Sequence, residues 1–476
     1  MSRIIVLGGS VAGLLSGMQL ARGGHDVTVL EREPHDAIAP PAHAPAAPRA
    51  GAPHAVQGHA LLARAAVEIR QTLPDLYAAL LAAGVGELDL IQGMPAAIAD
   101  RGPRAGDDDL VMLTSRRHTL DRVLVEVAEA TPRLDLRVGV SATGLVLARD
   151  GRDVPRVTGV QIEGGEALAA DVVVDASGRR TPVPRWLAAH GINLPLEAWD
   201  CGLVYFTRHY RVRAGAVRPP LNRVFSAGGL LPSLVIGWFP GDNGTAMLAQ
   251  TVLAEDRLLK TVHHTERFEA VARAVPTVAP WLDCADPITE VFGMGALQNT
   301  LRSIVQDGRP LVLGLHLVGD AACTTNPTLG RGLSFAAASA ANVAHILANE
   351  PDDSVAQALL LDARVGREIA PWFRENAQYD RTLVQLLRAD LVGQPPPDPP
   401  PPAADVLRPE ELLLAGMADP DLYRAFMRYT QLLADTAMLS GPSLVEEVRR
   451  LVPPGTRPPR LAGPTRADLA NVRAAL

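Results

Sequence analysis

The sequence contains little cysteine, few aromatic residues and a single lysine. Its 476 residues include three cysteines, Cys201, Cys284 and Cys323, which lie far apart and form neither a C-x-x-C pair nor a metal-ligand spacing. Such a distribution is typical of reduced thiols, and we expect a cytoplasmic protein. Lys260 is the only lysine, which excludes mechanisms that need a lysine elsewhere in the chain.

Long apolar runs and basic runs are also missing. No uninterrupted apolar stretch is long enough to cross a bilayer, so we expect no integral membrane segment. The formal net charge of −7 argues against a nucleic-acid partner. His54 and His59 could suggest a metal pair, but neither cysteine nor a cluster of carboxylates accompanies them, and we expect no metal centre.

A glycine-rich turn stands near the start of the chain. Ile4–Leu7 predicts a short buried strand, too short to be a membrane anchor, and a helix is predicted to follow it. The turn between them contains the small residues Gly8, Gly9, Ser10, Ala12 and Gly13. This is the dinucleotide fingerprint G-x-G-x-x-G, with serine at the second glycine. Since the first N–H groups of a helix bind phosphate, the pattern predicts a pyrophosphate site.

An acidic residue ends the next predicted strand. Val27–Leu30 is apolar and β-branched, and Glu31 follows it, 18 residues after Gly13. In dinucleotide-binding βαβ units an acid near this position accepts the ribose hydroxyls. A signal peptide would need a cleavage site and no such glycine pattern, so we interpret the opening segment as a nucleotide site.

Along the rest of the chain the spacing of apolar residues changes several times. Helical spacing runs from His59 to about Ala83 and again over Leu113–Ala130. Between Cys201 and Leu253 the pattern becomes alternating and β-branched, which predicts an antiparallel sheet. The pattern is helical again after residue 351, and the proline-rich segment 394–404 interrupts it as a stiff loop.

Two more segments carry side chains suited to a cofactor. In HLVGDAACTTNPTLGRGLSF a strand leads to Asp320, whose carboxylate can accept from a sugar hydroxyl, and Pro327, Gly330 and Gly332 then let backbone approach a flat ring. In TSRRHTLDRVL, Arg117 lies on a predicted helix. A third segment, DASGRRTP, contains Asp175, for which the sequence leaves open a role in the site or in capping a turn.

These motifs, in this order, resemble flavoprotein monooxygenases with the para-hydroxybenzoate hydroxylase type of fold. Within that group the chain looks most similar to the epoxidases of bacterial polyether biosynthesis and their relatives, over about residues 1–350. The resemblance implies FAD, with its ADP half on the glycine turn and Glu31, and with Arg32 beside the adenine. It further implies that Arg49, in RAGAPHAVQGHALL, and Arg117 contact the cofactor, and that Asp320 and the loop after it lie by the flavin.

The resemblance also implies an α/β fold in three parts. We expect a Rossmann-like FAD-binding domain at 1–200 and 290–350, an inserted antiparallel-sheet substrate domain at 200–290, and a C-terminal helical region at 351–476.

The implied activity is that of an FAD-dependent monooxygenase. It would insert one oxygen atom from O2 by epoxidation or hydroxylation, through a flavin C4a-hydroperoxide, in bacterial secondary metabolism. A flavin dehydrogenase or a prenyl-type reductase of the same fold remains an alternative. Flavin halogenases resemble one another in a W-x-W-x-I-P segment and an early lysine, whereas this chain has GWFPGDNG and Lys260. The sequence has no second G-x-G-x-x-G. Members of the group without a second nucleotide-binding fold receive electrons either directly from NADH or NADPH or from a separate flavin reductase, and the resemblance leaves both routes open.

The cofactor itself performs such chemistry, so no catalytic side chain is predicted. We expect a small-molecule substrate to lie between the sheet and the cofactor loop. The side chains predicted to contact it are Tyr205, Arg208, His209 and Trp238.

Overall fold

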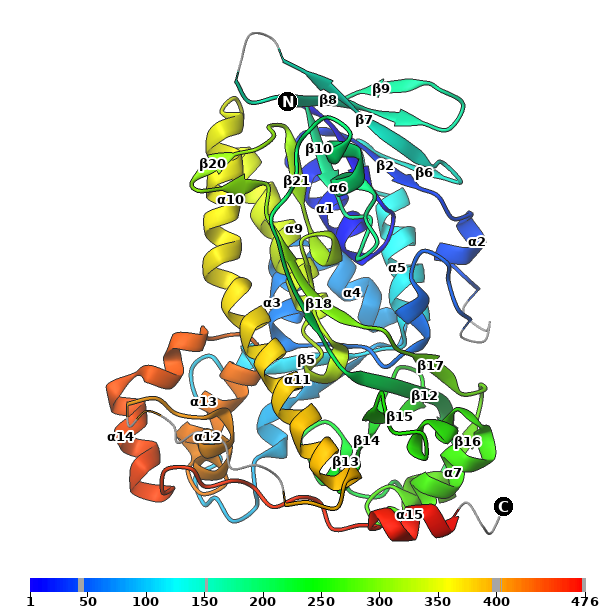
Figure 1. Ribbon diagram of the computed structural model, residues 1–476, viewed down its shortest axis with the longest axis vertical. Helices are drawn as coiled ribbons and strands as arrows, with labels where there is room; N and C mark the ends of the chain where they lie inside the picture. The colour runs from blue at the N-terminus through cyan, green and yellow to red at the C-terminus, as the bar shows by residue number, and fades with distance from the viewer. Residues whose placement is uncertain (42–46, 150–152, 396–402, 404, 473–476) are drawn as a thin grey trace.

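The computed structural model describes residues 1–41, 47–149, 153–395, 403 and 405–472. At its centre is a parallel sheet with strand order β21-β10-β1-β2-β6 (Figure 1). Its strands are β1 (Arg3–Leu7), β2 (Asp26–Glu31), β6 (Leu134–Val138), β10 (Val172–Asp175) and β21 (Leu315–Leu317). The chain runs outward from β1 in one direction to β6 and later in the other to β21. The order therefore reverses beside β1, where sheets of this type bind ligands.

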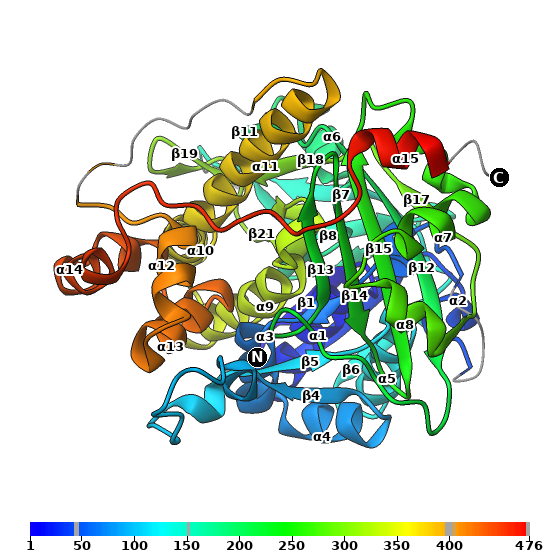
Figure 2. The ribbon, with the colours of Figure 1, turned by 90° about the horizontal axis from the view of Figure 1, so that it is seen from below.

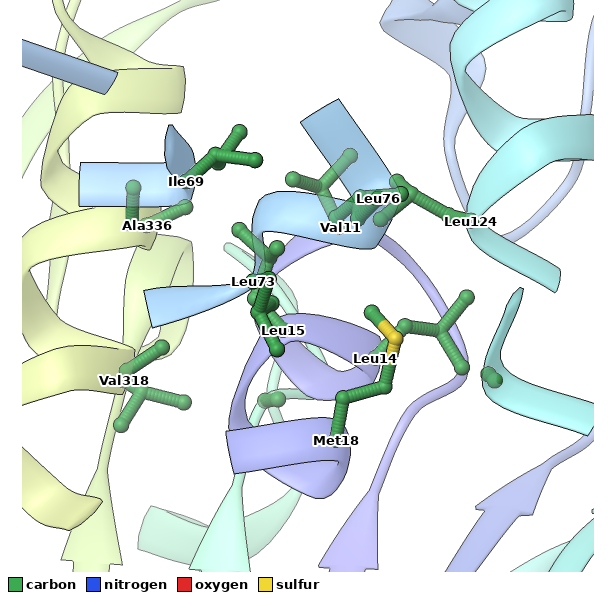
Figure 3. Packing of buried hydrophobic residues seen from close by; sticks show 14 of the residues in the cluster. Val11, Leu14, Leu15, Met18, Ile69, Leu73, Leu76, Leu124, Val318 and Ala336 are labelled. Atoms are coloured by element: carbon green, nitrogen blue, oxygen red, sulfur yellow. The ribbon is translucent and has the colours of Figure 1, made fainter. Parts of the chain in front are cut away.

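Strand β1 sends alternate side chains into two cores. Ile4 and Val6 join a core built with helices, whereas Ile5 and Leu7 join one built with a meander of three antiparallel strands. The helices are α1 (Val11–Arg22), α3 (Ala63–Thr72), α4 (Pro74–Ala82), α5 (Arg117–Glu129) and α9 (Gly332–Asn349). The meander is β7 (Ala142–Ala148), β8 (Arg156–Ile162) and β9 (Ala167–Ala169), with α6 (Val183–Ala188) beside it. Figure 3 shows Leu14 and Met18 of α1 in the helical core.

A second large sheet is antiparallel and lies apart from the first. Its strands are β12 (Leu203–Val212), β13 (Ala227–Leu231), β14 (Leu234–Pro240), β15 (Thr245–Leu253), β16 (Ala285–Pro287) and β17 (Phe292–Met294). Two helices, α7 (Thr265–Arg273) and α8 (Ala279–Asp283), pack on its outer face (Figure 2). A smaller sheet joins the two units with the order β11-β18-β22. Its strands are β11 (Leu196–Asp200), β18 (Gln298–Arg302) and β22 (Cys323–Thr324).

The last part of the chain is helical. It contains α10 (Ser354–Glu368), α11 (Ala370–Leu391), α12 (Pro409–Gly416), α13 (Pro420–Thr430), α14 (Pro442–Leu451) and α15 (Arg466–Val472). Most of the proline-rich segment 394–404 lies outside the described residues. The remaining short elements are α2 (His35–Ile38), β3 (Ala60–Leu61), β4 (Gly86–Asp89), β5 (Val111–Thr114), β19 (Val305–Gln306) and β20 (Arg309–Pro310). The expected α/β fold class with an antiparallel sheet and a C-terminal helical region is confirmed. In the described part, no helix combines the length and apolar character needed to cross a membrane.

Two helices begin or break elsewhere than the sequence pattern predicted. The expected helix from His59 to Ala83 is two helices, because Pro74 starts a new one at its first position. The expected helix over Leu113–Ala130 starts only at Arg117. Its first apolar residues form β5 instead, where they pair with β3 and β4.

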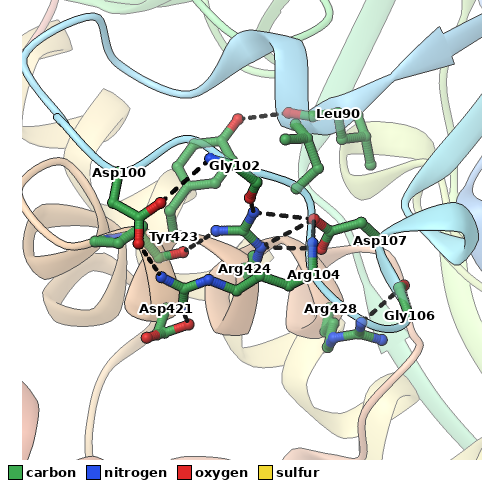
Figure 4. Close-up of polar contacts among 12 residues, drawn as sticks. Leu90, Asp100, Gly102, Arg104, Gly106, Asp107, Asp421, Tyr423, Arg424 and Arg428 are labelled. Carbon is green, nitrogen blue, oxygen red and sulfur yellow. Dashed lines mark hydrogen bonds and ion pairs between the residues drawn. The ribbon is translucent and has the colours of Figure 1, made fainter.

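Helix α13 is fastened to the loop before β5 by buried polar contacts (Figure 4). The Arg424 guanidinium donates to both oxygens of Asp107, at 2.9 Å each, and to the carbonyl oxygen of Gly102 at 2.7 Å. The Tyr423 hydroxyl donates to the carbonyl of Leu90 at 2.7 Å. Arg424 is only 5% exposed, so these bonds replace water around a buried charge.

We expect Arg424→Ala to lower the free energy of unfolding by about 2–3 kcal/mol, because it leaves Asp107 without its charged donor. Helices α12–α14 should then be cleaved first in limited proteolysis. Arg428→Ala provides the control, since Arg428 makes one bond, to the carbonyl of Gly106, and should cost about 1 kcal/mol or less. Equal proteolysis of the two variants would contradict this account.

Candidate functional site

The turn between β1 and α1 requires glycine at two positions. Gly8 has φ +101°, and a Cβ there would lie 2.6 Å from the carbonyl oxygen of Ala176. A Cβ at Gly13 would lie 1.8 Å from the carbonyl oxygen of Gly8, which no side chain can tolerate. Helix α1 thus starts directly against the strand end. Its N-cap residue, Ser10, makes no side-chain cap bond, so the first N–H groups of the helix face outward for an anion.

Glu31 lies against this turn from the neighbouring strand. It is 5% exposed, and its carboxylate accepts the backbone N–H of Gly9 at 2.7 Å and that of Glu33 at 2.9 Å. A Cβ at Gly9 would meet the Glu31 side chain at 2.8 Å. The acid is therefore positioned at the turn, as the fingerprint predicts. Arg32 is exposed beside it, and its contact with an adenine stays a prediction.

A chain of buried ion pairs connects the turn with helix α5. The Arg117 guanidinium donates to the Ser10 hydroxyl at 2.5 Å and to Asp121 at 2.6 Å. Asp121 also accepts from Arg49 at 2.6 Å, and Arg49 pairs with Glu33 at 3.0 Å. The structure thus brings both predicted arginines to the glycine turn. Arg49 bridges two carboxylates there, and its contact with the cofactor remains a prediction.

Asp320 lies at the carboxyl end of β21 beside the start of α1. A Cβ on the preceding Gly319 would lie 2.6 Å from Cβ of Ala12, which shows how closely the two segments pack. The carboxylate has no hydrogen bond to any residue the structure describes. Burial raises the pKa of Asp320 to about 6, although the charges of Arg117, Arg179 and Arg302 act in the opposite direction. Asp320 is only partly exposed, and an acceptor in such a place with no partner among the described residues fits a ligand hydroxyl.

Two histidines line the same region. The rings of His54 and His59 are 5.6 Å apart, and His54 Nε2 lies 3.3 Å from Arg117 Nη1. Burial and the neighbouring Arg117 charge lower the pKa of His59 to about 4 and hold the pKa of His54 well below its usual value. Both imidazoles are therefore neutral. The sequence drew attention to the pair only as metal ligands and did not indicate this contact with Arg117.

The loop before α9 exposes backbone as expected. Pro327–Leu329 forms a single helical turn, and Gly330 follows with φ +68°. A Cβ at Gly332 would meet no atom within 4 Å, so the start of α9 borders open space. No side chain caps this helix, and its first N–H groups are available to a ring carbonyl.

Asp175, in contrast, caps a turn. It is fully buried and accepts from the Ser177 backbone N–H at 3.0 Å, from the Ser177 hydroxyl at 2.5 Å and from the Thr181 hydroxyl at 2.6 Å. Its polar atoms are used within the turn, which settles the alternative that the sequence left open.

The antiparallel sheet separates the predicted substrate residues between its two faces. Tyr205, Thr207 and His209 alternate along β12 and face the cofactor segments. Thr207 donates to the Gln57 side chain at 2.7 Å, and His209 Nε2 lies 2.9 Å from the carbonyl oxygen of Val56.

Arg208 and Trp238 lie on the other face, away from the cofactor segments, and their contact with a substrate stays a prediction. They share one cross-strand row through Leu248, because Arg208 pairs with Leu248 and Leu248 with Trp238. Arg208 forms an ion pair with Glu269 of α7 at 2.7 Å. Trp238 is fully buried and stacks on Trp281 of α8. Because successive residues of a strand face opposite sides of the sheet, the sequence alone could have placed Arg208 on the face opposite Tyr205 and His209.

The raised pKa of Asp320 predicts how cofactor affinity changes with pH. We expect the affinity for FAD to fall about tenfold from about pH 8 to about pH 5, because a proton on Asp320 removes an acceptor for the sugar chain. Equilibrium titration with FAD, followed by fluorescence, measures the effect.

Asp320→Asn is the control for that titration. It should bind FAD more weakly than the parent chain at about pH 8 and lose the pH dependence, since an amide accepts at every pH in the range. A variant that keeps the same pH dependence would assign the titration to another group.

Comparison with known proteins places this geometry in a recognised fold. The flavin-dependent brominase Bmp2 superposes with a TM-score of 0.62 at 16% identity, over 94% of this chain and 98% of that one. PqsL from Pseudomonas aeruginosa, described as a probable FAD-dependent monooxygenase, gives 0.56 at 17% identity, over 82% and 98%. A Y270A mutant of 2-methyl-3-hydroxypyridine-5-carboxylic acid oxygenase gives 0.51 at 19% identity, over 83% and 98%. The chain thus has the para-hydroxybenzoate hydroxylase type of fold, which flavin-dependent monooxygenases and halogenases share.

Sequence comparison is less specific. Protein Rv3254 of Mycobacterium tuberculosis (strain ATCC 25618 / H37Rv) is 27% identical over 371 residues, which span 72% of this chain and 72% of that protein. No protein-family model matches the chain.

Proposed function

We propose that this protein is an FAD-dependent monooxygenase. The observation that carries the proposal is the meeting of three distant segments at the point where the parallel strand order reverses. The glycine turn, Arg117 and the Asp320 carboxylate, which has no hydrogen bond within the described residues, all lie at this edge. An anion-binding turn beside an acceptor for hydroxyls suits a dinucleotide with a sugar chain.

The residues present fit FAD along its length. The N–H groups at the start of α1 would hold the pyrophosphate, and Glu31 would accept from the ribose. Asp320 would accept from the ribityl chain, and the loop from Pro327 to Gly332 would lie against the flavin ring. The bound flavin would supply the oxygen chemistry.

The protein would contribute orientation and a dry surface. On the cofactor-facing side of the sheet, Tyr205, Val235, Gly237, Phe239 and Ala249 share face positions by strand register. These side chains carry no charge, so they would favour an organic substrate and exclude water from the reacting atoms. We propose a small molecule with an electron-rich carbon framework, which would be epoxidised or hydroxylated, in secondary metabolism. His209, with a pKa lowered by burial, would offer a neutral polar contact.

The second candidate is a flavin dehydrogenase or prenyl-type reductase, which would use the same cofactor site without inserting oxygen. NADH, NADPH or a separate flavin reductase could deliver electrons in either case.

Rapid mixing separates the two activities without knowledge of the substrate. The FAD-loaded protein is reduced with dithionite in the absence of air and mixed with oxygenated buffer while absorbance is recorded. A monooxygenase should form a transient flavin–oxygen adduct before the oxidised flavin returns. Reoxidation without such a transient would favour the dehydrogenase or reductase.

A further inference from the structure

A buried polar cluster joins the C-terminal helix α11 to the cofactor loop. Its centre is Asp380, which is 1% exposed and forms no ion pair with any residue in the described ranges. One carboxylate oxygen accepts from Asn326 Nδ2 at 2.6 Å, and the other accepts from Asn299 Nδ2 at 2.7 Å. Burial raises the pKa of Asp380, and the two amide donors act against that rise. The Cys201 thiol also bonds to this carboxylate. A buried carboxylate held by two amides and a thiol, with no ion pair among the described residues, needs an explanation.

The orientation of the Asn299 amide is fixed by the backbone. Its Oδ1 accepts the N–H of Asn326 at 2.7 Å, so its NH2 group must face Asp380. Asp380 is therefore an acceptor on that side. On its other side the Asn326 amide also turns its NH2 group toward the carboxylate, which leaves Asn326 Oδ1 pointing to Tyr205.

The Asn326 orientation sets the direction of a closed ring of hydrogen bonds. The Tyr205 hydroxyl donates to Asn326 Oδ1. With its proton used there, Tyr205 must accept from the Thr328 hydroxyl. Thr328 in turn accepts from Asn326 Nδ2 at 3.0 Å. Each member of the ring donates once and accepts once, and Asp380 decides the direction of the ring.

The ring reaches the proposed flavin site through Thr328. This residue is the middle of the Pro327–Leu329 turn, directly before Gly330 and the start of α9. Asn326 begins the same loop, and Tyr205 belongs to the cofactor-facing side of β12. One carboxylate on α11 therefore orients a hydroxyl on the sheet and a hydroxyl on the cofactor loop.

We propose that Asp380 is a positioning residue of the flavin site, which holds the loop from Asn326 to Gly332 against β12 by fixing the direction of the Asn326 amide. The proposal rests on the proposed function, because it requires that this loop receive FAD. It assigns a role in the cofactor site to the C-terminal helical region.

Asp380→Asn tests the direction of the ring with the packing unchanged. The new amide has one oxygen and one NH2 group opposite the two NH2 groups of Asn299 and Asn326, so its own NH2 group must face one of them. Since Asn299 is held by the backbone, Asn326 must rotate, and the ring reverses or opens. We expect the dissociation constant for FAD to rise about tenfold, together with a shift in the visible absorbance bands of the bound flavin. Tyr205→Phe should produce a similar shift, and the double variant should change the dissociation constant by less than the product of the two single effects.

Asp390→Asn is the matched control on the same helix. Asp390 pairs with Arg460 at 2.7 Å and accepts the backbone N–H of Ser233 at 3.1 Å, with no bond to the cofactor loop. It should lower thermal stability and leave FAD affinity and the flavin spectrum unchanged. Equal effects of the two substitutions on FAD would mean that α11 acts only through stability, and would overturn the assignment.

Thr328→Val opens the ring from the loop side, so the proposal stays testable if Asp380→Asn does not fold. Wild-type affinity and spectrum in Asp380→Asn, or in both Thr328→Val and Tyr205→Phe, would overturn the positioning role alone. Failure of the parent chain to bind FAD would overturn the proposed function, and this assignment with it.

Discussion

The Gly13→Val protein is expected to bind no FAD. A Cβ at this position would lie 1.8 Å from the carbonyl oxygen of Gly8, so helix α1 could not start where it does. The N–H groups at its first turn would move away from the pyrophosphate, and the Ser10 hydroxyl would leave Arg117. Both losses act on the same ligand group, so we expect removal of binding rather than a moderate decrease. The measurement is the flavin content of the purified protein after incubation with excess FAD and gel filtration.

Gly366→Val is the control for this substitution. Gly366 lies in α10, where a Cβ would meet no atom within 4 Å, so valine causes no clash there and has a slightly higher helix propensity than glycine. This variant should keep a full complement of FAD. A Gly13→Val protein that also keeps its FAD would show that the cofactor does not lie on this turn.

The Asp242→Ala protein is expected to lose about 3–5 kcal/mol of unfolding free energy, because it leaves a buried arginine without its partner. Asp242 is 1% exposed, and one of its oxygens accepts from Arg116 Nε at 2.9 Å and from Arg116 Nη2 at 2.7 Å. The other accepts the backbone N–H of Arg116 at 2.7 Å. Arg116 is the N-cap residue of α5, so a carboxylate from the β14–β15 turn caps the helix that carries Arg117.

This pair also predicts sensitivity to acid. Burial acts to raise the pKa of Asp242, but the Arg116 guanidinium and backbone N–H outweigh it and hold the pKa below its usual value. The stability that the pair contributes is therefore complete above the usual pKa of an aspartate and is lost as pH falls through the lowered value. Urea unfolding at several pH values measures both effects.

Asp286→Ala is the control in the same sheet. Asp286 pairs with Arg213 at 2.7 Å, but both side chains are about half exposed, so its loss should cost about 1 kcal/mol or less. Similar losses in the two variants would contradict the importance assigned to burial of the Arg116–Asp242 pair. The Asp242→Ala protein should also bind FAD more weakly, since the start of α5 positions Arg117.

The parts of the site that the sequence predicted are those whose conformation depends on residues close to them in the chain. Steric contacts within a few residues require glycine in the turn. Glu31 ends the next strand, at the sequence spacing from the turn that the fingerprint predicts. Asp320 and the glycines after it likewise occur within one short segment. Each of these positions is defined by its neighbours in sequence.

The parts that the sequence did not predict depend on long-range packing. Tyr205 and Arg208 both suit a substrate pocket, but only the positions of α7 and α8 decide which face of β12 is turned to the cofactor segments. The start of α5 depends on Asp242, 126 residues further along the chain. The link between Asp380 and the cofactor loop spans 54 residues, with no motif to indicate it.

The most direct test of the account is the absorbance spectrum of the purified protein after incubation with FAD and removal of the free cofactor. The account predicts oxidised flavin bands at a stoichiometric amount of FAD per chain, their absence in Gly13→Val, and their bleaching when NADH, NADPH or a reductase with its donor is added. A colourless parent protein that retains no FAD would contradict the assignment of the glycine turn, Arg117 and Asp320 as a flavin site.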